Sequence, residues 1–198
     1  MRTGLLGLTI VGLTACLCAG AARSETPVDT SGATACAIAG WSSDSDPAGL
    51  NVRAAPRLDA AVIARVPPPE QQDGDSYAAE FRIMGSRDGW LLVRDVRVVD
   101  YGSGKGDRLV FAGPGWVFGD KVRFTINRPE LRRAPKADGA ISAKLQSRDG
   151  SSGPDSAIID HVHSCSGTYA EVTAHLTGEP PRRGWVTGIC SNQVTTCP

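Results

Sequence analysis

The sequence predicts an all-β chain built from two tandem copies of one small domain, and three observations carry this prediction. Short apolar or alternating runs are separated by turn clusters rich in Gly, Pro, Asp and Ser, which is typical of strands joined by tight turns. Apolar residues do not keep helical spacing for three turns at any point after the N-terminal segment. Part of the chain also repeats after 79 positions, which indicates two copies of one fold.

The N-terminal 22 residues are predicted to be an export signal. Arg2 supplies the positive start, residues 5–17 form a mostly apolar stretch, and small residues follow at positions 19–22. The stretch is too short and too rich in Gly and Thr for a membrane span, which needs about 20 apolar residues. We therefore expect an exported chain without a transmembrane segment, located in the periplasm or secreted from a bacterium.

A second interpretation of the N-terminus is a lipoprotein signal. Leu13-Thr14-Ala15-Cys16 resembles the site at which bacterial lipoproteins are cut and acylated, so Cys16 could carry a lipid anchor. Cleavage near Ala21 or Ala22 instead leaves an even set of cysteines, which suits two disulfides in an oxidising compartment. We favour ordinary cleavage and expect disulfides among Cys36, Cys165, Cys190 and Cys197, with three connectivities open.

The expected elements follow in order along the mature chain. Residues 23–35 contain few bulky apolar side chains and are predicted to be a flexible leader. Strands are then expected at residues 61–66, 81–84, 90–93, 96–99, 109–111, 116–118 and 122–126. The runs 96–99 and 109–111 flank a Gly-rich segment, so they are predicted to form an elongated hairpin.

The repeat holds one alignment over much of each copy. The shift of 79 positions places Arg53 on Arg132, Ile83 on Val162 and Trp90 on Tyr169. The hairpin at residues 96–111 coincides with extra residues that only the first copy carries. The first copy is therefore expected to project a feature that the second lacks.

The motifs of the first copy resemble those of the bacterial SH3 (SH3b) domain family. Leu50-Asn51-Val52-Arg53-Ala54-Ala55-Pro56 matches its L-N-V-R-x-x-P pattern, the run 62–66 its V-I-G strand, and Asp88-Gly89-Trp90 and Gly115-Trp116-Val117 its later motifs. The second copy is similar but weaker, because Tyr169 replaces the middle Trp, while Gly184-Trp185-Val186 keeps the ending. The resemblance implies two tandem small SH3-like barrels, at residues 36–124 and 125–198.

The SH3b resemblance implies a function in binding rather than in catalysis. The expected ligand is cell-wall peptidoglycan or an envelope protein, held near Asn51 and Arg53 or by Tyr101, Lys105 and Arg108 of the hairpin. An alternative class is a periplasmic inhibitor or assembly factor that inserts this hairpin into a partner. Nucleic acid is not expected as a partner, because 21 basic residues balance 21 acidic ones.

Residues with possible chemistry do not assemble into a predicted catalytic or metal site. His161 and His163 would share one strand face, but a zinc site needs three or four ligands, and only His175 or Asp160 could be added. We expect a solvated strand face there, and no cofactor.

The four tryptophans, Trp41, Trp90, Trp116 and Trp185, could offer stacking surfaces for sugar rings or peptide. Trp90 and Trp116 are expected in the core, because a tryptophan buries a large area.

Overall fold

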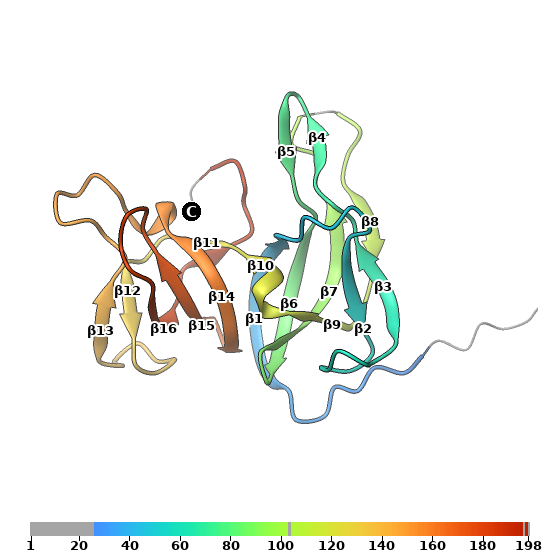
Figure 1. The fold of residues 1–198 in the computed structure, drawn as a ribbon, viewed down its shortest axis with the longest axis horizontal. Coiled ribbons are helices and arrows are strands. Elements are labelled where there is room, and N and C mark those ends of the chain that lie inside the picture. The colour runs from blue at the N-terminus through green and yellow to red at the C-terminus, as the bar shows by residue number, and fades with distance from the viewer. Residues whose placement is uncertain (1–25, 103, 196, 198) are drawn as a thin grey trace, which may run out of the picture.

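The structure is a computed structural model that describes residues 26–102, 104–195 and 197 (Figure 1). These residues form β-strands joined by turns, with two 3-10 helices, η1 (Gly119–Lys121) and η2 (Pro154–Ser156). The predicted all-β class is confirmed. No helix in the described residues is long and apolar enough to cross a membrane. The predicted signal at residues 1–22 and the alternative anchor at Cys16 lie outside the described residues.

The first sheet contains eight strands in the order β10-β1-β6-β7-β9-β2-β3, with β8 paired to β7. Its strands are β1 (Thr34–Ser42), β2 (Leu50–Arg53), β3 (Val62–Val66), β6 (Glu80–Arg87), β7 (Trp90–Val98), β8 (Arg108–Phe111), β9 (Gly115–Phe118) and β10 (Val122–Arg123). A separate hairpin of β4 (Glu70–Gln72) and β5 (Asp75–Tyr77) extends beyond it (Figure 1). We call residues 26–124 unit 1.

The second sheet contains five strands in the order β13-β12-β16-β15-β14. Its strands are β12 (Glu130–Arg132), β13 (Ile141–Lys144), β14 (Ile158–Ser166), β15 (Tyr169–His175) and β16 (Arg182–Val186). Two short strands, β11 (Thr125–Ile126) and β17 (Ile189–Cys190), pair with each other beside it. We call residues 125–197 unit 2.

The strand pairing repeats with the shift that the sequence predicted. Ile83 opposes Val93 in unit 1, and Val162 opposes Val172 in unit 2. One turn occurs in both units with the same hydrogen bond. The Arg53 guanidinium donates to the Ala60 carbonyl at 2.8 Å, and the Arg132 guanidinium donates to the Gly139 carbonyl at 3.0 Å. Equivalent residues therefore form equivalent ladders in the two units.

The two sheets are open in the described residues, because the outermost strands of each sheet do not pair with each other. The closed SH3-like barrels of the sequence prediction are therefore not shown. The predicted long hairpin is present as β7 and β8, where Val96 opposes Phe111 and Val98 opposes Arg108. The predicted run 122–126 divides into β10, which pairs with β1, and β11, which pairs with β17.

The two units share one continuous apolar core. Buried side chains from unit 1, such as Ile83 and Phe124, belong to the same cluster as Val162 and Val172 of unit 2. Strand β14 is an outer strand of the second sheet, and β1, β10 and η1 of unit 1 lie against it. The open edge that β14 would expose is therefore covered by the neighbouring unit.

The backbones of the two units approach each other closely at Gly119 of η1. A Cβ atom at this position would lie 2.0 Å from the backbone oxygen of Val162, so only glycine fits without a shift of backbone. Beside it, the buried Ser86 hydroxyl donates to the Cys165 carbonyl at 3.2 Å and accepts from the Cys165 N–H at 2.8 Å. These contacts fix the two units against each other.

All four cysteines of the predicted set are paired, as expected. Cys36 and Cys165 join the two units across 129 positions, and Cys190 and Cys197 close a short loop across 7 positions. The first bond connects β1 of unit 1 to β14 of unit 2. It lies at the contact already fixed by Ser86.

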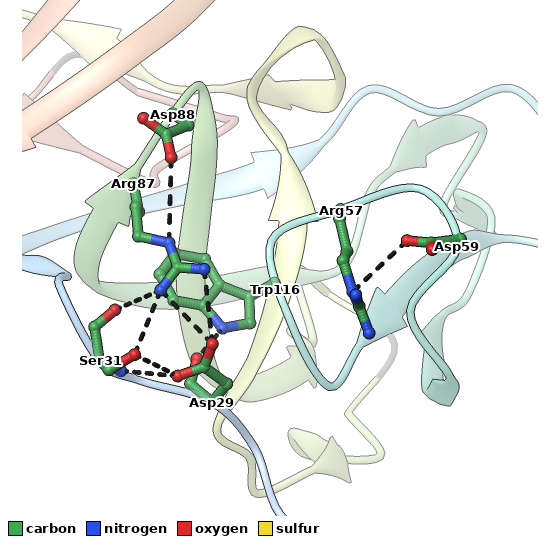
Figure 2. A network of polar contacts seen from close by, with 7 residues as sticks. All are labelled: Asp29, Ser31, Arg57, Asp59, Arg87, Asp88 and Trp116. Carbon is green, nitrogen blue, oxygen red and sulfur yellow. Dashed lines mark hydrogen bonds and ion pairs between the residues drawn. The ribbon is translucent and has the colours of Figure 1, made fainter.

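The segment predicted as a flexible leader instead packs against unit 1. Asp29 accepts from the Trp116 indole through its carbonyl at 2.8 Å, and its carboxylate binds Ser31 and Arg87 (Figure 2). Val28 and Ala33 pack on the cluster of Trp90, Leu92 and Trp116, and Thr34 already begins β1. We call residues 26–33 the strap, which covers a sheet face that would otherwise expose two tryptophans.

Candidate functional site

The feature that sets unit 1 apart is a projection formed by residues 70–77, 99–102 and 104–107, at the top of Figure 1. Its first arm is β4 and β5, which are joined by Asp73 and Gly74, both with positive φ (48° and 95°). An Asp-Gly pair in this conformation is the favoured two-residue hairpin turn. The Asp-Gly pair was visible in the sequence, but the polar residues of β4 and β5 do not show the apolar alternation that predicts strands.

The second arm of the projection consists of residues 99–102 and 104–107, and side chains hold the two arms together. The Gln72 amide donates to the Val99 carbonyl at 2.9 Å and accepts from the Tyr101 N–H at 2.9 Å. At the base, Arg108 forms an ion pair with Glu70. The projection therefore presents a fixed shape, which reduces the entropy that a partner would lose on binding.

The three predicted hairpin residues have different surroundings. Lys105 and Arg108 line a shallow cleft of about 420 Å³ between the two arms. Tyr101 turns toward the body of the protein, where its hydroxyl donates to Glu80 and its ring lies 4.7 Å from that of Tyr77. Burial and the Glu80 carboxylate raise the pKa of Tyr101. Tyr101 therefore anchors the projection, while Lys105 is its exposed cation.

A second cleft lies where the two units and the C-terminal loop meet. We call it the junction cleft; its volume is about 510 Å³, and it is lined by Trp41, Asp75, Ser76, Tyr77, Thr125, Gln193 and Val194. Trp41 alternates with the buried Gly40 and Ser42 along β1, so its indole faces away from them and is half-buried. An indole and a phenol thus border a cleft that also offers a carboxylate, hydroxyls and an amide.

Gln193 fixes the C-terminal loop at this cleft. Its side-chain amide donates to the Ala78 carbonyl and accepts from the Ala78 N–H, both at 2.9 Å. Its backbone N–H donates to the Tyr101 hydroxyl at 3.3 Å. The loop closed by Cys190 and Cys197 is therefore joined to unit 1, and the cleft exists only when both units are assembled.

Sequence reasoning missed Tyr77 and Gln193 as cleft residues. Trp41 was identified only as one of four tryptophans. The spacing of Cys190 and Cys197 was the available signal for a constrained loop, but its contact with unit 1 depends on tertiary packing.

The other predicted binding residues, Asn51 and Arg53, lie on β2 and not on the projection. Arg53 is engaged by the Ala60 carbonyl, so its guanidinium closes a turn. The Asn51 side-chain oxygen is buried and has no hydrogen-bond partner among the described residues. The structure does not bring these two residues together with Tyr101, Lys105 and Arg108.

The histidines of unit 2 lie near the contact between the units. His161 pairs with Asp120 of η1, and its ring lies 4.1 Å from that of His163. Burial, and then the charges of His161 and Arg183, lower the pKa of His163. His175 pairs separately with Asp160 at 2.9 Å, and the described residues contain no group of three or more potential ligands arranged to hold a metal ion.

A hydroxyl also lies beside His163. Its Nε2 is 2.8 Å from the Thr173 Oγ1. Nucleophilic catalysis needs a further group to orient the base and donors for the developing oxyanion. The contact alone does not assign a reaction.

The predicted core positions of Trp90 and Trp116 are confirmed, with exposed fractions of 6% and 0%. They belong to the small cluster under the strap, on the opposite side of β7 from Leu91 and Val93. Trp185, in the second unit, is half-buried. Trp41 and Trp185 are therefore the tryptophans whose rings remain accessible.

Comparisons of the chain with protein-family models, with curated proteins and with solved structures find no match.

Proposed function

We propose that this chain is an exported, non-catalytic binding module of the bacterial envelope, and that its ligand is cell-wall peptidoglycan bound in the junction cleft. The SH3b-like motifs described above favour this class of ligand. The observation that carries the proposal is that Trp41 and Tyr77 line one cleft together with Asp75 and Ser76. Aromatic rings pack on the apolar face of a sugar, while carboxylate and hydroxyl groups bond its hydroxyls.

The dimensions of the cleft agree with this proposal. Small-molecule sites commonly occupy about 300 to 1,000 Å³, and the junction cleft lies in that range at about 510 Å³. Both disulfides lie in elements next to the cleft or to the unit contact, so they keep the cleft assembled outside the cell. A preassembled cleft loses little conformational entropy on binding.

The test is sedimentation of the oxidised protein with purified peptidoglycan sacculi. Trp41→Leu and Tyr77→Ala each remove an aromatic ring from a half-buried position. The first leaves an apolar side chain and the second a small one. Each should weaken binding about tenfold, since about 1.4 kcal/mol of lost contact corresponds to that factor. Trp185→Leu in unit 2 is the matched control and should bind like the unchanged protein.

Two results would remove the proposal. One is the absence of sedimentation with sacculi, and the other is a loss of binding in the Trp185→Leu protein alone. The second result would move the ligand to the outer face of unit 2.

The braced projection supports a second candidate function, as an inhibitor or assembly factor that inserts the projection into a partner protein. The observation in its favour is the cross-bracing by Gln72, which holds an exposed loop in one shape. Lys105→Glu should then abolish capture of an envelope protein and leave sedimentation with sacculi unchanged. If Lys105→Glu leaves capture of that protein intact, the projection is not its binding site.

A further inference from the structure

We use the word seam for the outer edge of β3 in unit 1 and of its counterpart β13 in unit 2. The two units differ at this seam. In unit 1, β8 lies against the outer strand β3, and Val110 and Phe111 of β8 pack on the core together with Ile63. A Cβ atom on Gly115 would lie 3.2 Å from Ile63 and 3.5 Å from Phe111, so both side chains lie beside Gly115. Strand β8 thereby covers the edge of the first sheet.

Unit 2 has no separate strand equivalent to β8 among the described residues, and β16 itself lies near β13 there. Its outer strand β13 is the counterpart of β3 and pairs only with β12 among the described strands. The chain runs from the end of β15 at His175 to the start of β16 at Arg182 without an intervening strand. Exposed Ser142 occupies the position that corresponds to Ile63. The hydrogen-bonding groups on the outer edge of β13 are therefore not paired with another strand among the described residues.

A groove of about 430 Å³ lies beside this edge, and we call it the edge groove. It is lined by Ala143 and Lys144 of β13 and by Arg148, Glu179, Pro180 and Arg182, among others. Lys144, Arg148 and Arg182 are exposed, and none of them forms an ion pair with a carboxylate in the described part of the chain. Three cations and one carboxylate, that of Glu179, thus line the groove beside β13.

We infer that the edge groove binds an extended, acidic segment of a partner protein, which pairs with β13 as an added strand. An unpaired strand edge offers a row of N–H and C=O groups to an incoming strand. The half-buried Ala143 lines the groove and gives an apolar side chain of the segment a surface to pack on. Carboxylates on alternate residues meet the three cations, and arginine binds carboxylates with two parallel hydrogen bonds.

The charge of the groove determines which strands it accepts. A lysine on an edge strand discourages pairing with neutral or basic strands, because its charge would be desolvated or repelled. An acidic segment neutralises the same charge. The groove is therefore selective for an acidic partner, and this site is separate from the junction cleft.

The test is a selection of linear random peptides on the oxidised mature protein, followed by affinity and hydrogen-exchange measurements. The selected peptides should alternate apolar residues with Asp or Glu. Arg182→Glu should weaken their binding at least tenfold, whereas Arg57→Glu, an exposed arginine of unit 1 with the same change of charge, should leave it unchanged. Binding should also slow amide exchange in β13.

Three results would overturn the inference. The selected peptides could lack acidic residues, or they could bind the Arg182→Glu protein as well as the unchanged one. Alternatively, polyphosphate could compete fully while β13 exchange stays unchanged, which would make the groove a polyanion site without strand pairing. None of these results depends on sedimentation with sacculi.

Discussion

The two disulfides should contribute unequally to stability because they close loops of very different length. In the chain-entropy model, a cross-link stabilises the fold by restricting the unfolded chain, and its contribution grows with the logarithm of the loop length. The loops span 129 and 7 positions. At 25 °C these lengths correspond to about 5 kcal/mol for Cys36–Cys165 and about 2.5 kcal/mol for Cys190–Cys197.

The perturbation that isolates each bond is reduction of a variant that keeps only that bond. The Cys190→Ala/Cys197→Ala protein keeps the long cross-link, and the Cys36→Ala/Cys165→Ala protein keeps the short one. Urea unfolding of each variant, oxidised and reduced, gives the contribution of one bond without a change of side chain between the two measurements. The difference in the free energy of unfolding should be about twice as large for the long cross-link.

This comparison also tests whether the units fold together. A shared core means that both units unfold in one transition, so the long cross-link restricts the whole unfolded chain. If reduction of the long cross-link lowers the free energy of unfolding by no more than reduction of the short one, the chain-entropy model does not describe these two bonds. Two separate unfolding transitions would refute the single core.

Two further predictions concern the unit contact and an acidic turn. Gly119→Ala should destabilise the protein by about 1 to 3 kcal/mol in urea unfolding, because its Cβ would overlap a backbone oxygen. The control is Gly153→Ala, whose Cβ would meet only a side-chain atom and which should change stability little. Equal effects of the two substitutions would contradict the tight contact at Gly119. Hydrogen bonds from Ser147, and then from Ser151, lower the pKa of Asp149 from 3.8 to about 2, so the turn keeps this stabilisation above about pH 4 and loses it as the pH falls toward 2. Ser147→Ala should raise the pKa of Asp149 toward 3.8 in an NMR titration of its carboxyl, and an unchanged titration would show that the hydroxyl is not the cause.

The repeat was the part of the fold that sequence reasoning predicted best. Equivalent residues such as Ile83 and Val162 are apolar in both copies, because each lies on the buried side of an equivalent strand. The turn that begins at Arg53 and Arg132 also repeats, because a guanidinium closes it in both copies. Local patterns and their periodicity carry this information directly.

The strap was not predicted, because its composition is that of a flexible segment. The signal for it lay elsewhere, in β7 and β9. Leu91 and Val93 alternate with Trp90 and Leu92, so apolar residues occupy both sides of β7. A sheet with large side chains on both faces needs a second cover, and Trp116 also needs an acceptor for its buried indole N–H.

The candidate site was predicted only in part for a related reason. The hairpin at residues 96–111 could be recognised from its two arms and Gly-rich tip. The inward turn of Tyr101 depends on Glu80 and Gln193, which lie far away in the sequence. The junction cleft likewise depends on contacts between units, which local patterns do not encode.

Mapping of a bound peptidoglycan fragment shows whether the junction cleft is the binding site that we propose. The measurement is an NMR titration of the oxidised protein with a purified soluble muropeptide, followed at the Trp41 indole, the Gln193 amide and the Trp185 indole. We predict that Trp41 and Gln193 shift together along one saturable binding curve while Trp185 stays unchanged. No shift at Trp41 and Gln193, or saturable shifts at Trp185 alone, would show that the junction cleft does not bind peptidoglycan.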